Sequence, residues 1–174
     1  MRLSPAASLL TFAFFLALTG AGFAPKAEAL ANCSAPPAPG VDWSRCVFGE
    51  VAYEEADLSG ARLVGARLKH SAFPGSNFTD VEARGAKFVS SDLKGARFDK
   101  ADLTDADMTK ANLQGASFKG AKLRRTRLFR ANLQGADFTD ANLDQTDFLH
   151  ADLTGATWTD GKHVCGDGSI GRCK

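Results

Sequence analysis

The chain has 174 residues, of which 44% are hydrophobic, and a formal net charge of +1 at pH 7. This length suits one domain preceded by a leader. The near-neutral total charge argues against a protein whose bulk charge recruits nucleic acid or an acidic partner.

The first 29 residues predict a cleavable signal peptide. Arg2 supplies one positive charge, and Leu9–Leu18 is an apolar run shorter than the roughly 20 residues that a membrane-spanning helix needs. Ala27-Glu28-Ala29 fits the A-x-A rule and predicts cleavage after Ala29, with Ala24 as an alternative site. We therefore expect a periplasmic or secreted protein that has no membrane contact after the leader is removed.

Four cysteines follow the leader, and an even number in an exported chain predicts two disulfides. We favour Cys33–Cys46 and Cys165–Cys173 among the three possible connectivities, because these pairs flank opposite ends of the repeats described below. A metal site that combines His163 with Cys165 and Cys173 is an alternative, but it lacks the paired C-x₂-C spacing of zinc sites. Residues 30–33 also resemble a lipoprotein box, which leaves acylation of Cys33 open.

A five-residue repeat begins at Cys46. Every fifth residue is large and apolar, and the residue two positions earlier is small, usually alanine. Between residues 48 and 158 there are 23 such positions, and only Ala83 breaks the rule. The residue between the two is often Asp or Asn, as in Ala101-Asp102-Leu103. A period of five fits neither a helix nor a simple strand, and two inward positions per unit imply a chain that turns a corner at each unit.

This A-[D/N]-L-x-x pattern resembles the pentapeptide-repeat family over residues 46 to 160. The resemblance implies an all-β fold, the right-handed quadrilateral β-helix, with four units per coil and about six coils. We accordingly divide the chain into a signal peptide (1–29), an N-terminal cap (30–47), the β-solenoid (48–160) and a C-terminal cap (161–174).

The sequence also supports a coil of 20 residues. Glycine recurs at that spacing at Gly75, Gly95, Gly115, Gly135 and Gly155, which suggests one corner that needs a positive φ. Aromatic residues should stack on one face at the same spacing: Phe78, Phe98, Phe118, Phe138 and Trp158. Ala83 should leave a gap in the core, which the extra bulk of Val81 would compensate.

Charge is distributed unevenly along the repeats. Residues 84–130 contain twelve Lys and Arg and five Asp, whereas residues 131–160 contain six Asp and no Lys or Arg. Folded into coils, one corner alternates in sign from coil to coil, which predicts a ladder of ion pairs. Its members are Arg84, Lys87, Asp105, Asp107, Arg124, Arg125, Arg127, Asp144 and Asp147. The ladder favours a structural role for these charges over nucleic-acid binding.

The sequence shows no catalytic constellation. His70 and His150 share an edge but are 80 residues, or four coils, apart, which places them about 19 Å from each other. The recurrent aspartates are expected to bond to the backbone of the turns. We therefore expect no catalytic residues, no metal ligands and no cofactor, and we do not expect an enzyme.

One corner column could form a contact surface. Val89, Thr109, Phe129 and Leu149 share an outward position at intervals of 20 residues, beside Lys110, Arg130 and His150. Exposed apolar patches often mark interfaces, although isolated surface apolar residues are common. We select Val89, Phe129, Leu149 and Arg130 as a possible interface with a protein partner or with a second copy of the chain.

The predicted function is that of a non-enzymatic periplasmic binding or scaffold protein, with no nucleic-acid partner. The family resemblance implies an alternative, since some pentapeptide-repeat proteins resemble DNA in shape and charge and bind DNA gyrase. That role calls for a cytoplasmic protein with a strongly acidic surface, and this chain departs from both requirements through its leader and its basic middle. An enzyme that binds small anions in corner grooves is a third, less favoured alternative.

Overall fold

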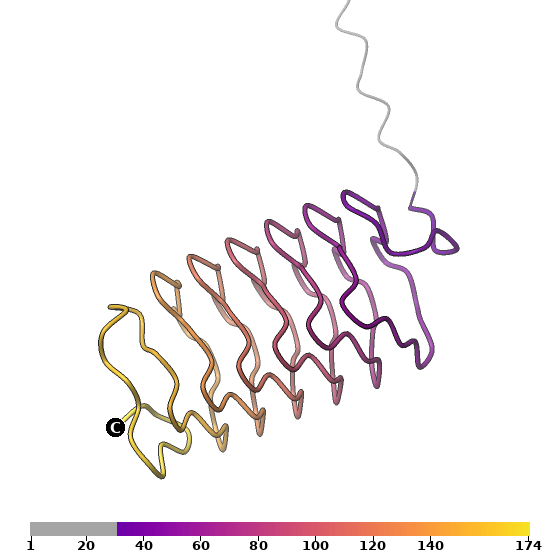
Figure 1. Ribbon diagram of the computed structural model, residues 1–174. Helices are drawn as coiled ribbons and strands as arrows, with labels where there is room; N and C mark the ends of the chain where they lie inside the picture. Colours follow the sequence, from indigo (N-terminus) through magenta and orange to yellow (C-terminus); the bar gives the residue numbers. More distant parts are fainter. Residues whose placement is uncertain (1–30) are drawn as a thin grey trace, which may run out of the picture.

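The computed structural model describes residues 31–174 as a solenoid of stacked coils (Figure 1). The predicted signal peptide and residue 30 lie outside the described residues. Residues 31–174 contain no helix and no extended strand, and hence no helix that could cross a membrane. Their β-structure consists of isolated bridges, and the parallel ones join residues 20 apart, from Asp42↔Arg62 to Asp137↔Thr157. The 20-residue coil is therefore confirmed, while the number of coils stays a prediction.

Each five-residue unit forms one side and one corner of a coil. In the unit 61–65, the side chains of Ala61 and Leu63 are fully buried and Arg62 forms the bridges. The N–H of Arg62 donates to the preceding coil, and those of Leu63 and Gly65 donate to the next, with N···O distances of 2.7 to 2.9 Å. The N–H of Ala61 closes the preceding turn onto the Leu58 carbonyl at 3.0 Å. Four of the five backbone donors are thus satisfied by backbone carbonyls.

The fifth backbone donor explains the recurrent Asp and Asn. The N–H of Thr104, the first residue of its turn, donates to Oδ1 of Asp102 at 3.1 Å, and Asn132 accepts from Gln134 in the same way at 3.2 Å. The other aspartates predicted to bond to turns make the same contact: Asp107, Asp137, Asp147 and Asp152. That prediction is confirmed, and the polar position of the repeat is a turn cap.

Positive φ is a property of every corner. From residue 55 to residue 155, every fifth residue has a φ between 51° and 73°. Many of these residues are not glycine, and His70 (56°), Lys110 (58°) and Arg130 (55°) are examples. The prediction that the glycine-bearing corner needs positive φ is confirmed from Gly75 to Gly155, but the other corners have positive φ as well. The reason is that a type II turn requires a left-handed third residue, whatever its side chain.

The core consists of side chains stacked from coil to coil. The rings of Phe78, Phe98, Phe118 and Phe138 lie 4.7, 5.4 and 5.2 Å apart in succession and are tilted by only 4 to 8°. Trp158 ends this column, edge-on to Phe138 at 5.8 Å. Ala83 and Val81 are both buried, at 0% and 1% exposure. The predicted aromatic column is confirmed.

A disulfide and a buried aromatic residue close the N-terminal end. Cys33 is bonded to Cys46, as predicted, so the Cys33 sulfur is not available for acylation. Trp43 is fully buried, lies 4.6 Å from the ring of Phe48, and donates from Nε1 to the Ala35 carbonyl at 3.2 Å.

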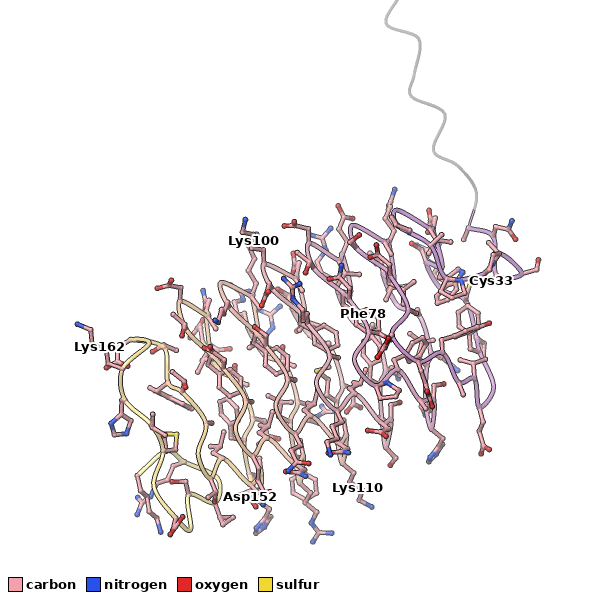
Figure 2. All side chains as sticks on the ribbon, viewed as in Figure 1. Cys33, Phe78, Lys100, Lys110, Asp152 and Lys162 are labelled. Atoms are coloured by element: carbon pink, nitrogen blue, oxygen red, sulfur yellow. A yellow bond between two sulfur atoms is a disulfide. The ribbon has the colours of Figure 1, made fainter. Side chains whose placement is uncertain are left out.

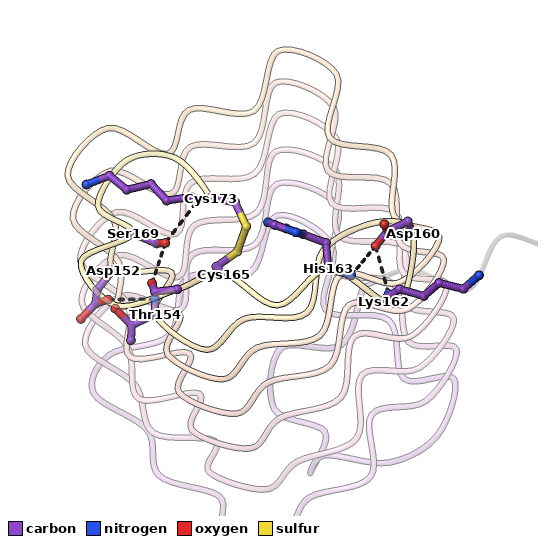
Figure 3. Close-up of a disulfide and its surroundings, with 10 residues drawn as sticks. Asp152, Thr154, Asp160, Lys162, His163, Cys165, Ser169 and Cys173 are labelled. Carbon is purple, nitrogen blue, oxygen red and sulfur yellow. Dashed lines mark hydrogen bonds between the residues drawn. A yellow bond between two sulfur atoms is a disulfide. The ribbon is translucent and has the colours of Figure 1, made fainter.

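The C-terminal end is closed by residues 161–174, which fold back over the last coil (Figure 3). The second predicted disulfide, Cys165–Cys173, is present. Two antiparallel bridges, Thr157↔Val164 and Asp152↔Ile170, end the parallel ladder on two sides. Because the direction of the chain reverses here, the cap cannot continue the 20-residue register.

Candidate interaction surface

The predicted apolar column lies on one edge of the solenoid. We call this the ridge edge, and it consists of residues 69–70, 89–90, 109–110, 129–130 and 149–150. The N–H of Ser90 donates to the Thr109 carbonyl, that of Lys110 to Phe129, and that of Arg130 to Leu149, at 2.9 to 3.0 Å. These bonds fix residues 109, 129 and 149 directly above one another.

The ridge edge is partly apolar and open to solvent. Val89, Thr109 and Phe129 are half-buried, and Leu149 is 56% exposed. The Phe129 ring lies between two neighbours, with the Arg130 guanidinium carbon 5.1 Å from its centroid and the His150 ring edge-on at 5.7 Å. The first contact has the geometry of a cation–π interaction and orients Arg130 along the edge. All four residues predicted as an interface therefore belong to one edge.

The predicted ion-pair ladder is formed in part, on the neighbouring edge. Arg125 makes two bonds to Asp105, at 2.7 and 2.6 Å, and Arg127 pairs with Asp107 at 3.4 Å. Hydrogen bonding from Arg125 lowers the pKa of Asp105 below its ordinary value.

The remaining members of the ladder behave differently. Arg84 pairs with Asp102 at 3.2 Å instead of with residue 105 or 107. Asp144 and Asp147 form no ion pair among residues 31–174. Lys87 and Arg124 form no ion pair among these described residues either, so the ladder neutralises the middle coils only in part and does not extend to the last one.

Three exposed apolar side chains were not singled out from the sequence. Val47 is 70% exposed, Val164 56% and Ile170 49%, and all three occupy bridge positions, which are usually polar in the repeats. The exposure of Val47 could have been predicted from the sequence, because this apolar residue occupies a repeat position that is usually polar. Val164 and Ile170 lie beyond the last repeat, so the repeat register could not place them.

No cluster of catalytic or metal-binding groups appears in the described part of the chain. His70 and His150 both lie on the ridge edge, four coils apart. Residues 31–174 contain no group of three His, Cys, Asp or Glu side chains that could hold a metal ion.

The profile of pentapeptide repeats matches the chain in eight copies, over residues 42–80, 54–88, 86–125 and 121–157. These segments together span the residues that form the parallel bridges. The chain belongs to the pentapeptide-repeat family. Members of this family are right-handed quadrilateral β-helices, and they are generally structural or binding proteins.

Several solved pentapeptide-repeat structures are similar to this chain. HetL, involved in heterocyst differentiation regulation in the cyanobacterium Nostoc sp. strain PCC 7120, is 27% identical, over 71% of this chain and 62% of HetL (TM-score 0.46). A protein of the Arabidopsis thaliana thylakoid lumen is 28% identical, over 70% of this chain and 83% of its own (TM-score 0.43). QnrB1, a plasmid-mediated fluoroquinolone resistance protein, is 22% identical, over 68% of this chain and 69% of QnrB1 (TM-score 0.51). No curated protein matches the chain.

Proposed function

We propose that this pentapeptide-repeat protein is a non-enzymatic binding or scaffold protein that presents its ridge edge to another protein or to a second copy of itself. The observation that carries the proposal is the apolar column on that edge, with Val89 and Phe129 half-buried and Leu149 more than half exposed. Such side chains contribute little to the core, and a partner that covers them would remove apolar area from water.

The periplasm or the exterior of the cell is the proposed location. Two disulfides, one at each end, indicate an oxidising compartment. The predicted signal peptide supports the same assignment.

Replacement of Phe129 by aspartate tests the proposal. If the chain self-associates, a charge at this position should abolish the self-association, as measured by size exclusion with light scattering. If the chain binds another protein, the charge should abolish capture of that partner from periplasmic extract. The binding is then repeated with the purified partner. The matched control is Gln114→Asp, because Gln114 occupies the same half-buried position on another edge. The proposal would be overturned if the wild-type protein is a monomer and the Phe129→Asp variant captures the same proteins as the wild type.

The gyrase-binding role is a second candidate, supported by the family and disfavoured by charge. Residues 84–130 contain seven more basic than acidic residues, which is opposite to a DNA-like surface. Gyrase supercoiling assays with a fluoroquinolone, together with cell fractionation, separate the candidates. Protection of gyrase by the chain in the cytoplasm would favour the second candidate over the first.

A further inference from the structure

We propose that the ridge edge recognises an acidic, partly apolar polypeptide segment that runs along the solenoid axis. This inference rests on the proposed function and names the chemistry of the partner. It is carried by the unneutralised positive charge that accompanies the apolar column.

The ridge edge has no acidic residue from Lys69 to His150. Its ten residues include three fixed cations, Lys69, Lys110 and Arg130, and all three are exposed. None of them forms an ion pair with any of residues 31–174, whereas Arg84, Arg125 and Arg127 of the neighbouring edge and face are paired with aspartates. The positive charge of this edge is therefore free to act on a partner.

The other three edges lack this combination of charge and apolar surface. One mixes Arg84, Arg124 and Arg125 with Asp105 and Asp144, and Arg125 is paired with Asp105. The glycine-rich edge carries Lys94 as its one basic residue. The edge opposite the ridge places Asp80, Asp99 and Asp140 among its lysines. Figure 2 shows Lys110 and Lys100 pointing into solvent from opposite sides of the solenoid.

The spacing of the edge suits an extended partner. Lys110, Arg130 and His150 lie on successive coils, and neighbouring strands are about 4.8 Å apart. A partner aligned with the axis would meet one of these side chains on each of the three coils, with the column of Phe129 and Leu149 beside them. Nucleic acids and acidic glycans supply the negative charge without apolar side chains, so the apolar column favours a polypeptide that has both.

A random copolymer of glutamate and tyrosine is a suitable probe, with polygalacturonate and duplex DNA as polyanions without apolar side chains. Binding of the oxidised full-length mature protein to each is measured at about 50 mM and about 500 mM NaCl. We expect the copolymer to bind more tightly than either polyanion and to be weakened by salt. Equal binding of polygalacturonate or DNA would overturn the inference.

Charge reversal on the ridge edge locates the binding. Lys110→Glu/Arg130→Glu should weaken binding of the copolymer by about tenfold or more, because two exposed attractions become repulsions. The control Lys94→Glu/Lys100→Glu changes the net charge equally on other edges and should leave the affinity within about twofold of the wild type. Similar losses in both variants would overturn the inference. If Lys110→Glu/Arg130→Glu does not fold, Lys110→Gln/Arg130→Gln replaces it, with a smaller loss in the same direction.

The same variants separate this inference from the proposed function. A natural partner that is lost with Phe129→Asp and retained by Lys110→Glu/Arg130→Glu would contradict the acidic partner and leave the ridge interface standing. Retention by both variants would contradict the two proposals together.

Discussion

At the scale of single residues, every corner of the solenoid imposes a left-handed backbone. Gly115 has a φ of 67°, and a Cβ built there would meet no heavy atom within 4 Å. Gly115→Ala therefore isolates the backbone cost, and we expect it to lower the free energy of unfolding by about 1 kcal/mol. Gly115→Asn should lose less, because asparagine tolerates this conformation. Urea denaturation measures both changes, and an alanine variant as stable as the wild type would show that the corners are not strained.

The residue pair that breaks the repeat offers a second test. Val81 occupies a small position and Ala83 a large one, and both are buried. Val81→Ala alone should cost about 2 kcal/mol by opening a cavity, and Ala83→Leu alone about 1–3 kcal/mol by overpacking. The double variant restores the pattern of Ala101-Asp102-Leu103 one coil later and should cost clearly less than the sum. Additive losses in a double-mutant cycle would show that the two side chains do not share space.

At the scale of the turn, the capping aspartates link stability to pH. Burial by itself would raise the pKa of Asp102 and Asp137, but hydrogen bonds from Thr104 and Thr139 and the nearby Arg84 and Lys119 lower it below its ordinary value. A carboxylate whose pKa is lower in the folded than in the unfolded chain stabilises the fold above its unfolded pKa, about 3.9, and loses this contribution as pH falls further. We therefore expect constant stability near neutral pH and a decrease below about pH 4.

Asparagine is the matched control for this pH dependence. Asn112 and Asn132 cap their turns in the same way as the aspartates and do not titrate in this range. Asp102→Asn/Asp137→Asn should flatten the decrease in melting temperature between about pH 5 and pH 2. The ion pairs with Arg84 and Lys119 are lost as well, so the variant should also be slightly less stable at pH 7. If the melting temperature of the variant decreases with falling pH as steeply as that of the wild type, other carboxylates cause the acid sensitivity.

The regular part of the fold could be predicted because each repeat position has one environment. The five-residue period places Leu63 inside and Arg62 outside, and the 20-residue recurrence places Phe78 under Phe98. Left-handed corners at His70 or Arg130 could not be predicted from those residues, because the bonds between coils impose the turn type against local preference. Arg84 likewise reaches Asp102 because a long side chain has several partners within range, and charge patterns do not choose among them. The ridge column could be predicted from the period, but the contact of Arg130 and His150 with Phe129 depends on side-chain conformation.

At the scale of the whole molecule, each end has its own disulfide and its own tryptophan. The chain has two tryptophans, Trp43 next to the Cys33–Cys46 disulfide and Trp158 in the last unit before the Cys165–Cys173 loop. In a solenoid each repeat contacts only its neighbours, so one end should be able to open while the other stays closed. Single-tryptophan variants, Trp43→Phe and Trp158→Phe, report the C-terminal and the N-terminal end separately.

Removal of one disulfide should therefore destabilise only the end of the solenoid that it closes. Closing a loop as short as Cys165–Cys173 contributes about 2–3 kcal/mol on the chain-entropy account. Cys165→Ser/Cys173→Ser in the Trp43→Phe background should move the Trp158 fluorescence transition to lower urea. The same cysteine variant in the Trp158→Phe background should leave the Trp43 transition in place, and Cys33→Ser/Cys46→Ser should give the mirror result. If either disulfide moves both transitions equally, the solenoid unfolds as one cooperative unit, and the caps stabilise the whole column of stacked side chains rather than their own ends.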